Sequence, residues 1–269
     1  MDWKDFFDRL GMNGTRWQWR VMRWERYWKA FWRGDPNTGT LSLSRGLIYL
    51  NVILFAAMII QGLASGFGGS TLLNPDVNLL IHSGAQYWPY VVYDNQWWRC
   101  ITYAYTHGGL IHLGFNMMVL YQVGPLIENE IGPARFFILY TLAALTATAA
   151  GYFWHPMVPV VGASGSLFGL IGFAITYYHR VGVGAHDLRN FMVKWAIFAF
   201  IFGIIVGADN AAHFGGAICG AILGMFLPLG IRGRQKMKFI FNLMAGISLV
   251  ATIASLIILI SGWLIFIGQ

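Results

Sequence analysis

Three apolar stretches of this sequence each carry polar groups that can take part in catalysis. One holds His112 and Asn116 four residues apart, a second contains Ser164, and a third contains His213. Strongly polar side chains inside apolar segments are costly, so each of them is a functional candidate. A serine hydroxyl and a histidine base are the two groups that nucleophilic acyl transfer requires. Ser164 is therefore a candidate nucleophile, and His213 is its candidate general base.

Acyl transfer also needs hydrogen-bond donors for the tetrahedral oxyanion. The spacing of four residues places His112 and Asn116 on one face of a helix, from which both side chains can donate. The backbone N–H of Ser164 can add a third donor near the start of a helix. Two alternatives stay open: Ser164 as a simple helix cap, and His112 with Asn116 as a bridge between helices.

The composition indicates which elements must position these groups. Of the 269 residues, 57% are hydrophobic and only 11% are charged, and the mean hydropathy is +0.56. Soluble domains carry about a quarter charged residues, whereas a membrane-spanning helix needs roughly 20 apolar residues. We therefore predict an all-α, polytopic membrane helix bundle with spans near residues 46–64, 104–124, 134–152, 162–179, 192–207, 210–229 and 240–267.

The basic residues predict how this bundle is oriented. The chain has 18 Lys and Arg residues, half of them at or before Arg45 and most others in short loops. With the N-terminus in the cytoplasm, only Arg99 falls outside, as the positive-inside rule requires. The C-terminus is then extracytoplasmic. Short loops and the absence of a visible transit peptide favour a prokaryotic plasma membrane, and the spread of the basic residues argues against nucleic acid as a partner.

This orientation brings the candidate groups to one depth. The second, fourth and sixth spans run the same way, so His112, Ser164 and His213 all lie near the outer leaflet. Glycines recur at small-xxx-small spacing in the fourth and sixth spans, which lets helix backbones approach closely. If the two spans pack through these faces, Ser164 and His213 come within hydrogen-bond reach. The glycines are Gly165, Gly169 and Gly172 in the fourth span and Gly216, Gly220 and Gly224 in the sixth.

The basic, Trp-rich segment 1–45 reads as an amphipathic helix at the cytoplasmic membrane surface. Its apolar positions are spaced by three and four residues, and its arginines fall largely between them. A solvated basic segment or a partner-binding helix is the alternative. The apolar positions are Trp17, Val21, Trp24, Trp28 and Phe31.

Four other polar residues are given roles outside the chemistry. Asp209 is expected to cap a helix start rather than to act as a third catalytic acid. His107 is expected to stabilise an interfacial loop, and Arg99 to anchor the long external loop at the lipid headgroups. Glu128 is expected in a cytoplasmic loop, far from the site.

Several motifs together resemble those of the rhomboid family. They are Trp98-Arg99, the stretch from His107 to Asn116, Gly162-Ala163-Ser164-Gly165, and Ala212-His213-Phe214-Gly215-Gly216 followed by Gly220. The resemblance covers roughly residues 46–229. It implies a six-helix rhomboid core at 46–229, with the segment 230–269 adding a basic loop and one C-terminal transmembrane helix.

The resemblance also implies an activity and residue roles. It implies an intramembrane serine endopeptidase that cleaves transmembrane segments of membrane proteins near the extracytoplasmic side, without cofactor or metal. Ser164 and His213 would form a dyad without a third acid. His112 and Asn116 would line the oxyanion site, and Gly162 would belong to the nucleophile loop. The partners implied are transmembrane substrates and the lipid bilayer.

One position departs from the family pattern. Many bacterial members have tyrosine where Phe168 stands, four residues after the nucleophile, with the ring against the catalytic histidine. Phe168 keeps the aromatic surface and loses the hydroxyl, which predicts tuned rather than abolished activity. Together with Gly165, Gly216 and Gly220, Phe168 is expected to pack the helices around the site.

Other classes of protein fit the sequence less well. A catalytically silent relative that binds transmembrane clients would be expected to have lost the serine or the histidine. A transporter would place polar groups along a pathway, whereas these cluster at one depth. The chain has no H-E-x-x-H zinc motif. Its Gly162–Ser166 stretch also lacks the last glycine of the G-x-S-x-G hydrolase elbow.

Overall fold

The structure is a computed structural model that describes residues 3–33, 42–205 and 208–267. Within these ranges the regular elements are helices, and one isolated antiparallel bridge joins Gln86 to Val160. The α-helices are α1 Trp3–Arg9, α2 Gly14–Arg33, α3 Leu43–Ala64, α4 Val77–His82, α5 Trp88–Tyr93, α6 Arg99–Thr102, α7 Leu110–Ile131, α8 Pro133–Trp154, α9 Ser164–Val181, α10 His186–Ile205, α11 Asn210–Phe226, α12 Ile231–Lys236 and α13 Lys238–Ile267. Three short 3₁₀ helices are η1 Gly69–Leu72, η2 Tyr103–Tyr105 and η3 Val183–Ala185.

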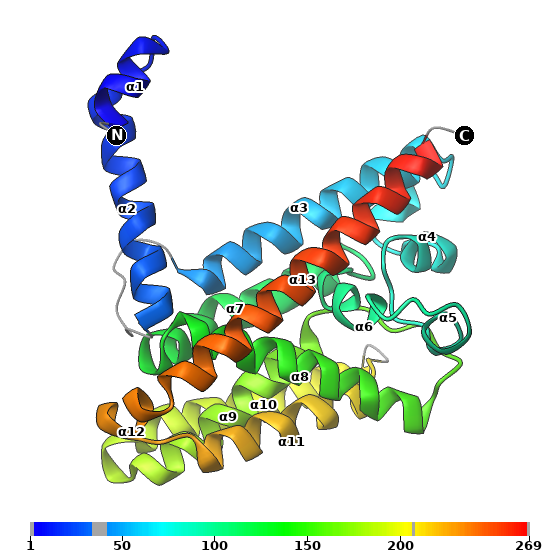
Figure 1. The fold of residues 1–269 in the computed structure, drawn as a ribbon. Coiled ribbons are helices and arrows are strands. Elements are labelled where there is room, and N and C mark those ends of the chain that lie inside the picture. The colour runs from blue at the N-terminus through cyan, green and yellow to red at the C-terminus, as the bar shows by residue number, and fades with distance from the viewer. Residues whose placement is uncertain (1–2, 34–41, 206–207, 268–269) are drawn as a thin grey trace.

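The long helices from α3 onward form one bundle with roughly aligned axes, and α2 extends away from it (Figure 1). The short helices α4, α5 and α6 gather at the end of the bundle where α3 ends, and α12 lies at the opposite end. Because the chain reverses direction at each connection, α7, α9 and α11 all begin at the end near α4–α6. This arrangement agrees with the prediction that the second, fourth and sixth spans begin at the same end of the bundle.

Among the described residues, five helices are long and apolar enough to cross a membrane: α3, α7, α8, α10 with the turn before it, and α13. The chain is therefore a multi-pass integral membrane protein with an all-α fold. The helices that carry Ser164 and His213 do not meet the same measure, since α9 has 18 residues that include His179 and Arg180 in its last turn, and α11 has only 17. Helices lie at all seven positions given above, and a count of seven spans stays a prediction.

Helix α7, which corresponds to the second predicted span, differs from the expected range of 104–124. It starts at Leu110, because η2 and an extended backbone at Thr106 occupy the preceding residues. It also passes through Pro125 and ends only before Gly132. The expectation that Glu128 lies in a loop is therefore wrong, since it belongs to the last helical turns of α7.

Glu128 is buried and ties the end of α7 to the start of α3. Its carboxylate accepts hydrogen bonds from the backbone N–H groups of Leu43 (2.6 Å) and Ser44 (2.9 Å). The hydroxyls of Ser42 (2.8 Å) and Ser44 (2.9 Å) donate to it as well. A carboxylate at this position satisfies N–H groups that a helix start leaves free and matches the positive end of the helix dipole.

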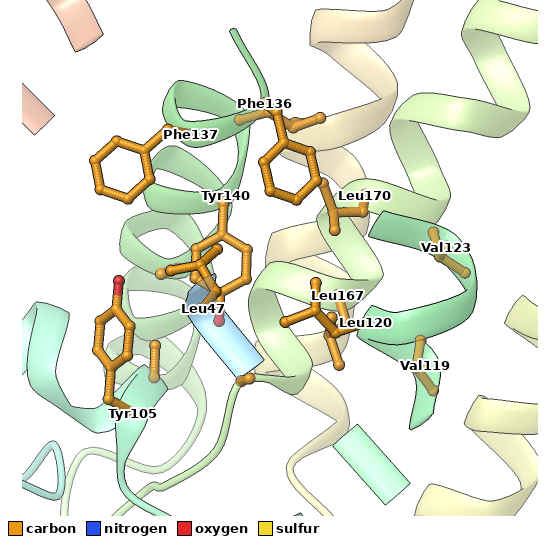
Figure 2. Close-up of a cluster of buried hydrophobic side chains, with 14 of the residues drawn as sticks. Leu47, Tyr105, Val119, Leu120, Val123, Phe136, Phe137, Tyr140, Leu167 and Leu170 are labelled. Carbon is orange, nitrogen blue, oxygen red and sulfur yellow. The ribbon is translucent and has the colours of Figure 1, made fainter. Parts of the chain in front are cut away.

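The core of the bundle lies between α7, α8 and α9. Figure 2 shows Phe136 and Tyr140 of α8 beside Leu167 and Leu170 of α9, with Leu120 of α7 close by. All five side chains are buried. Inside a membrane the alternative to this packing is contact with lipid, so close van der Waals packing of these side chains, rather than their removal from water, holds the helices together. This packing fixes the helix that begins at the candidate nucleophile.

Glycines set the distance between α9 and α11. A Cβ atom on Gly216 would overlap the carbonyl oxygen of Gly165, and one on Gly220 would overlap that of Gly169. The two backbones are therefore in direct contact, as the small-xxx-small spacing predicts.

The N-terminal segment forms two helices where one was expected. The Asp8 carboxylate accepts a hydrogen bond from Gly14 N at the turn between them (2.8 Å). In α2, Tyr27 is buried, whereas Trp24 and Trp28 are exposed. The side chain of Phe31, the last expected apolar position, lies outside the described part of the chain.

The last helix, α13, packs a polar stripe against the rest of the bundle. Ser248, Thr252 and Ser255 are buried on one face, although the helix as a whole is strongly apolar. Trp263 donates from its indole nitrogen to the carbonyl oxygen of His82 (3.1 Å). The helix is thus bound to the end of α4.

Arg99 stabilises the long connection between α3 and α7, with its side chain inside that connection. Its guanidinium donates to the carbonyl oxygens of Ile81 (2.6 Å) and Ala85 (2.9 Å) and to the side-chain oxygen of Gln96 (2.5 Å). Burial lowers the pKa of Arg99 to about 10, so the group stays charged at neutral pH. The expectation that Arg99 reaches the headgroups is wrong, because its side chain is buried by these contacts.

Candidate active site

Ser164 is the first residue of α9, and the turn before it is built on Gly162. Gly162 has a φ of 115°, which L side chains rarely adopt, and its N–H donates to the carbonyl oxygen of Tyr103 (2.9 Å). A Cβ atom there would also lie 2.7 Å from the His112 ring. Only glycine lets this turn press against His112, so Gly162 places the start of α9 beside that ring.

His213 lies in the first turn of α11 and is almost fully buried. Its ring stacks on that of Phe168, with centroids 4.2 Å apart and an interplanar angle of 18°. Asp209 caps the helix by accepting a hydrogen bond from Ala212 N at 3.0 Å, as expected from the sequence. The histidine is thus held by one aromatic face and by the backbone of a capped turn.

Two cavities bring the candidate residues together. A small one of about 40 Å³ is lined by Ser164, His213, His112, Asn116 and Phe168, among others. A larger one of about 660 Å³ is also lined by Ser164 and His112, and it extends along residues 158–162. The polar groups that the sequence singled out in three separate helices therefore line one common cavity.

The structure does not contain the hydrogen bond expected between Ser164 and His213. Among the described residues, neither ring nitrogen of His213 has a hydrogen-bond partner. The two side chains line one cavity without being paired in it. Catalytic hydrogen bonds are often long or misaligned in proteins without substrate, so this geometry leaves the pairing available.

His112 is oriented as an oxyanion donor would be. Its Nδ1 accepts a hydrogen bond from Gly108 N (3.3 Å), which in a neutral ring places the proton on Nε2. Nε2 is also one of the ring atoms nearest to Gly162. Asn116 donates from its amide nitrogen to the carbonyl oxygen of His112 (3.1 Å), so this helix face is internally linked.

His107 lies behind the site, in the loop before α7. It is fully buried, and its ring centroid is 5.3 Å from that of His112. Burial lowers the pKa of His107 well below its ordinary value, and the nearby His112 lowers it further. The residue belongs to a loop, as expected, and the loop folds its ring into the bundle. The depth of this loop relative to the membrane surface stays a prediction.

Sequence reasoning missed one polar residue at the site. His155, at the C-terminal end of α8, lies 2.7 Å from Asp209, measured from Nε2 to Oδ1, and both line the larger cavity. The only signal in the sequence is a histidine directly after an apolar helix, which does not name its partner. Within the described ranges, no group of three or more His, Cys, Asp or Glu residues is arranged to hold a metal ion.

Comparisons with known proteins agree with the motifs. The family model of the Rhomboid domain matches residues 94–230, about half of the chain. Rhomboid protease GluP of Bacillus subtilis is 30% identical over 204 residues, which are 74% of this chain and 36% of that protein. RHOMBOID-like protein 7 of Arabidopsis thaliana is 30% identical over 167 residues, which are 60% of this chain and 52% of that protein.

A third relative bears on activity. The Inactive RHOMBOID-like protein 8 of Arabidopsis thaliana is 28% identical over 155 residues, which are 55% of this chain and 43% of that protein. The chain spans between about a third and about a half of the length of these three relatives. The matches include both proteases and a protein named as inactive, so activity must be argued from the site.

Proposed function

This chain belongs to the rhomboid family, and from that premise we propose that it is an intramembrane serine endopeptidase that cleaves transmembrane segments of membrane proteins. Ser164 is the nucleophile and His213 the general base. The observation that carries the proposal is the shared cavity, which is lined by both residues and by His112 and Asn116. Four polar side chains from three helices around one buried space fit acyl transfer better than they fit helix packing.

The chemistry follows from the groups present. The Ser164 oxygen attacks the carbonyl carbon of the scissile bond while His213 takes the hydroxyl proton. The oxyanion accepts hydrogen bonds from His112 Nε2, the Asn116 amide and the Ser164 backbone N–H. When the C–N bond breaks, His213 gives its proton to the leaving amine, and an acyl ester remains on Ser164. A water molecule, deprotonated by His213, then hydrolyses this ester and restores the free serine.

No third catalytic acid takes part in this scheme. The Asp209 oxygen Oδ1 already accepts from Ala212 N and lies 2.7 Å from His155 Nε2. Neither ring nitrogen of His213 has a hydrogen-bond partner among the described residues, Ser164 and Asp209 included. The engagement of Asp209 as a helix cap and as the partner of His155 is what supports a dyad without a third acid.

The larger cavity supports a substrate that arrives as an unwound segment. It is lined by residues 158–162, which precede α9 and lie outside any helix, and by both Ser164 and His112. Its place at the starts of α9 and α11 puts hydrolysis near one membrane surface, which we propose is the extracytoplasmic one. The N-terminus is then cytoplasmic and the C-terminus extracytoplasmic, in a prokaryotic plasma membrane.

The chain divides, in this proposal, into three parts. Residues 1–45 form a basic amphipathic segment on the cytoplasmic side, and residues 46–229 form the six-helix protease core. Residues 230–269 add a basic loop and a seventh transmembrane helix. The contact of α13 with the end of α4, through Trp263, supports a structural role for this last part.

Two observations favour a second candidate function, a silent relative that binds transmembrane clients. Ser164 and His213 are not hydrogen-bonded in the structure, and one matched relative is named as inactive. The two candidates differ in whether a bound substrate is cut. Cleavage of a single-span substrate in liposomes by wild type, and not by Ser164→Ala, supports the protease. Binding of that substrate without any cleavage supports the silent relative.

A further inference from the structure

The residues just upstream of the two proposed catalytic groups are paired with each other. His155 lies nine residues before Ser164, and Asp209 lies four residues before His213. Their side chains meet at 2.7 Å between Nε2 and Oδ1. This contact joins the end of α8 to the start of α11 at the rim of the larger cavity.

Asp209 is also hydrogen-bonded to the first turn of α11, the helix that carries His213. Its oxygen Oδ1 accepts from Ala212 N (3.0 Å), and its backbone oxygen accepts from His213 N (3.1 Å). The backbone of His155 is held at the end of α8, because its backbone N–H donates to the carbonyl oxygen of Gly151 (2.9 Å). Both residues are thus held at helix ends, so their contact fixes the position of the start of α11 relative to the end of α8.

The chemistry of this contact allows a persistent hydrogen bond. Imidazole Nε2–H donates to a carboxylate in the neutral tautomer and in the charged ring alike. The two side chains are only 23% and 16% exposed, which shields the bond from solvent. Hydrogen bonds to a charged group are roughly twice as strong as those between neutral groups.

His213 needs such support from its surroundings. Its ring nitrogens have no hydrogen-bond partner within the described ranges, so its position depends on the Phe168 stack and on the first turn of α11. The close glycine contacts between α9 and α11 lie from Gly216 onward, further along the helix. The start of α11 is held to α8 through His155 and Asp209.

We propose that His155 and Asp209 are a positioning pair that keeps His213 in place relative to Ser164. This inference rests on the proposed protease function. Neither residue contacts reacting atoms in the scheme above. The pair acts by fixing the turn from which the general base projects.

The test uses the full-length protein in liposomes with a fluorophosphonate that labels the catalytic serine. His155→Ala and Asp209→Ala are each expected to lower kcat and the labelling rate about tenfold, with KM within about twofold. His155→Gln, which keeps a donor, should stay within about threefold of wild type. His186→Gln, at an exposed histidine of α10, is the matched control and should change nothing.

A double variant separates a pair from two independent residues. If His155 acts only through Asp209, the double alanine variant is no slower than Asp209→Ala alone. A loss equal to the product of the single losses would overturn the proposal. So would a His155→Ala protein that melts at lower temperature yet labels at the wild-type rate, because that outcome describes a structural contact only.

Hydrogen exchange gives a readout that does not need activity. In His155→Ala, the backbone amides at the first turn of α11, residues 211–214, are expected to exchange faster than in wild type. Unchanged exchange would overturn the tie. If wild type itself is not labelled at Ser164, the protease proposal fails, and the exchange result alone then decides whether the tie exists.

Discussion

The ring of Phe168 stacks on the ring of His213, with centroids 4.2 Å apart and planes 18° from parallel. The two residues come from different helices, α9 and α11, whose backbones are in contact through glycines. Among the described residues His213 has no hydrogen bond to either ring nitrogen, so the stack is a side-chain contact that can orient its ring. In the proposed mechanism this aromatic face does the orienting that a third acid does in a serine triad.

Replacing Phe168 tests this role. Phe168→Ala removes the stack and should lower kcat/KM about five- to twentyfold, the size of an aromatic contact plus some lost order in His213. Phe168→Tyr keeps the ring and should remain within about threefold of wild type. The measurement is the rate of substrate cleavage in liposomes. An alanine variant as fast as wild type would show that the stack does not orient the base.

The glycine contact between α9 and α11 predicts a sharp effect on stability. A side chain at Gly220 would overlap the carbonyl oxygen of Gly169, so Gly220→Val must push the helices apart. We expect a loss of at least about 1–3 kcal/mol in unfolding free energy, the range for overpacked cores. Gly230→Val, at a glycine with no atom within 4 Å of an added Cβ, is the control. Equal stability of the two variants in detergent unfolding would contradict the close packing.

His107 predicts a dependence of stability on pH. Burial holds its pKa well below the ordinary value, so the folded protein keeps the ring neutral while the unfolded chain protonates it near pH 6.5. The unfolded state then binds more protons below that pH, and stability falls as pH drops, by up to about 1.4 kcal/mol per pH unit. His107→Leu should flatten this part of the curve between about pH 6.5 and 5. Melting curves of both proteins with identical slopes would refute the assignment.

The exposed tryptophans of α2 predict contact with lipid headgroups. Trp24 and Trp28 are exposed on the apolar side of a helix rich in arginine, while Tyr27 faces the bundle. Spin labels at residues 24 and 28 should be shielded from water-soluble relaxants in liposomes with anionic lipid. Labels at Met22 and Arg26 are the matched controls and should stay accessible. Equal accessibility of the two sets would rule out a membrane-lying helix.

The parts of the site that follow periodic patterns could be predicted from the sequence. The glycine spacing of α9 and α11 is a property of each helix alone, and it identified the pair of helices that are in contact. The cap at Asp209 is likewise local, since its partner Ala212 lies three residues away. The rhomboid motifs are residue types in a fixed order along the chain, and this order indicates the family.

Contacts between distant segments could not be predicted in this way. The sequence predicts Arg99 at the lipid headgroups and Glu128 in a loop, because charged residues near loops are usually exposed. In the structure both side chains form hydrogen bonds to backbone groups of other segments. The pairing of His155 with Asp209 spans 54 residues and has no local signal. The state of the Ser164–His213 hydrogen bond depends on side-chain rotamers, which a residue pattern does not encode.

The central claim, that Ser164 is a nucleophile activated by His213, is tested most directly by covalent labelling. Full-length protein in liposomes is treated with a fluorophosphonate, and the adduct is located by mass spectrometry in wild type, Ser164→Ala and His213→Ala. We expect an adduct on Ser164 in wild type, none at that position in Ser164→Ala, and labelling slowed at least about a hundredfold in His213→Ala. A wild-type protein that forms no adduct, or a His213→Ala variant that labels at the wild-type rate, would contradict the dyad.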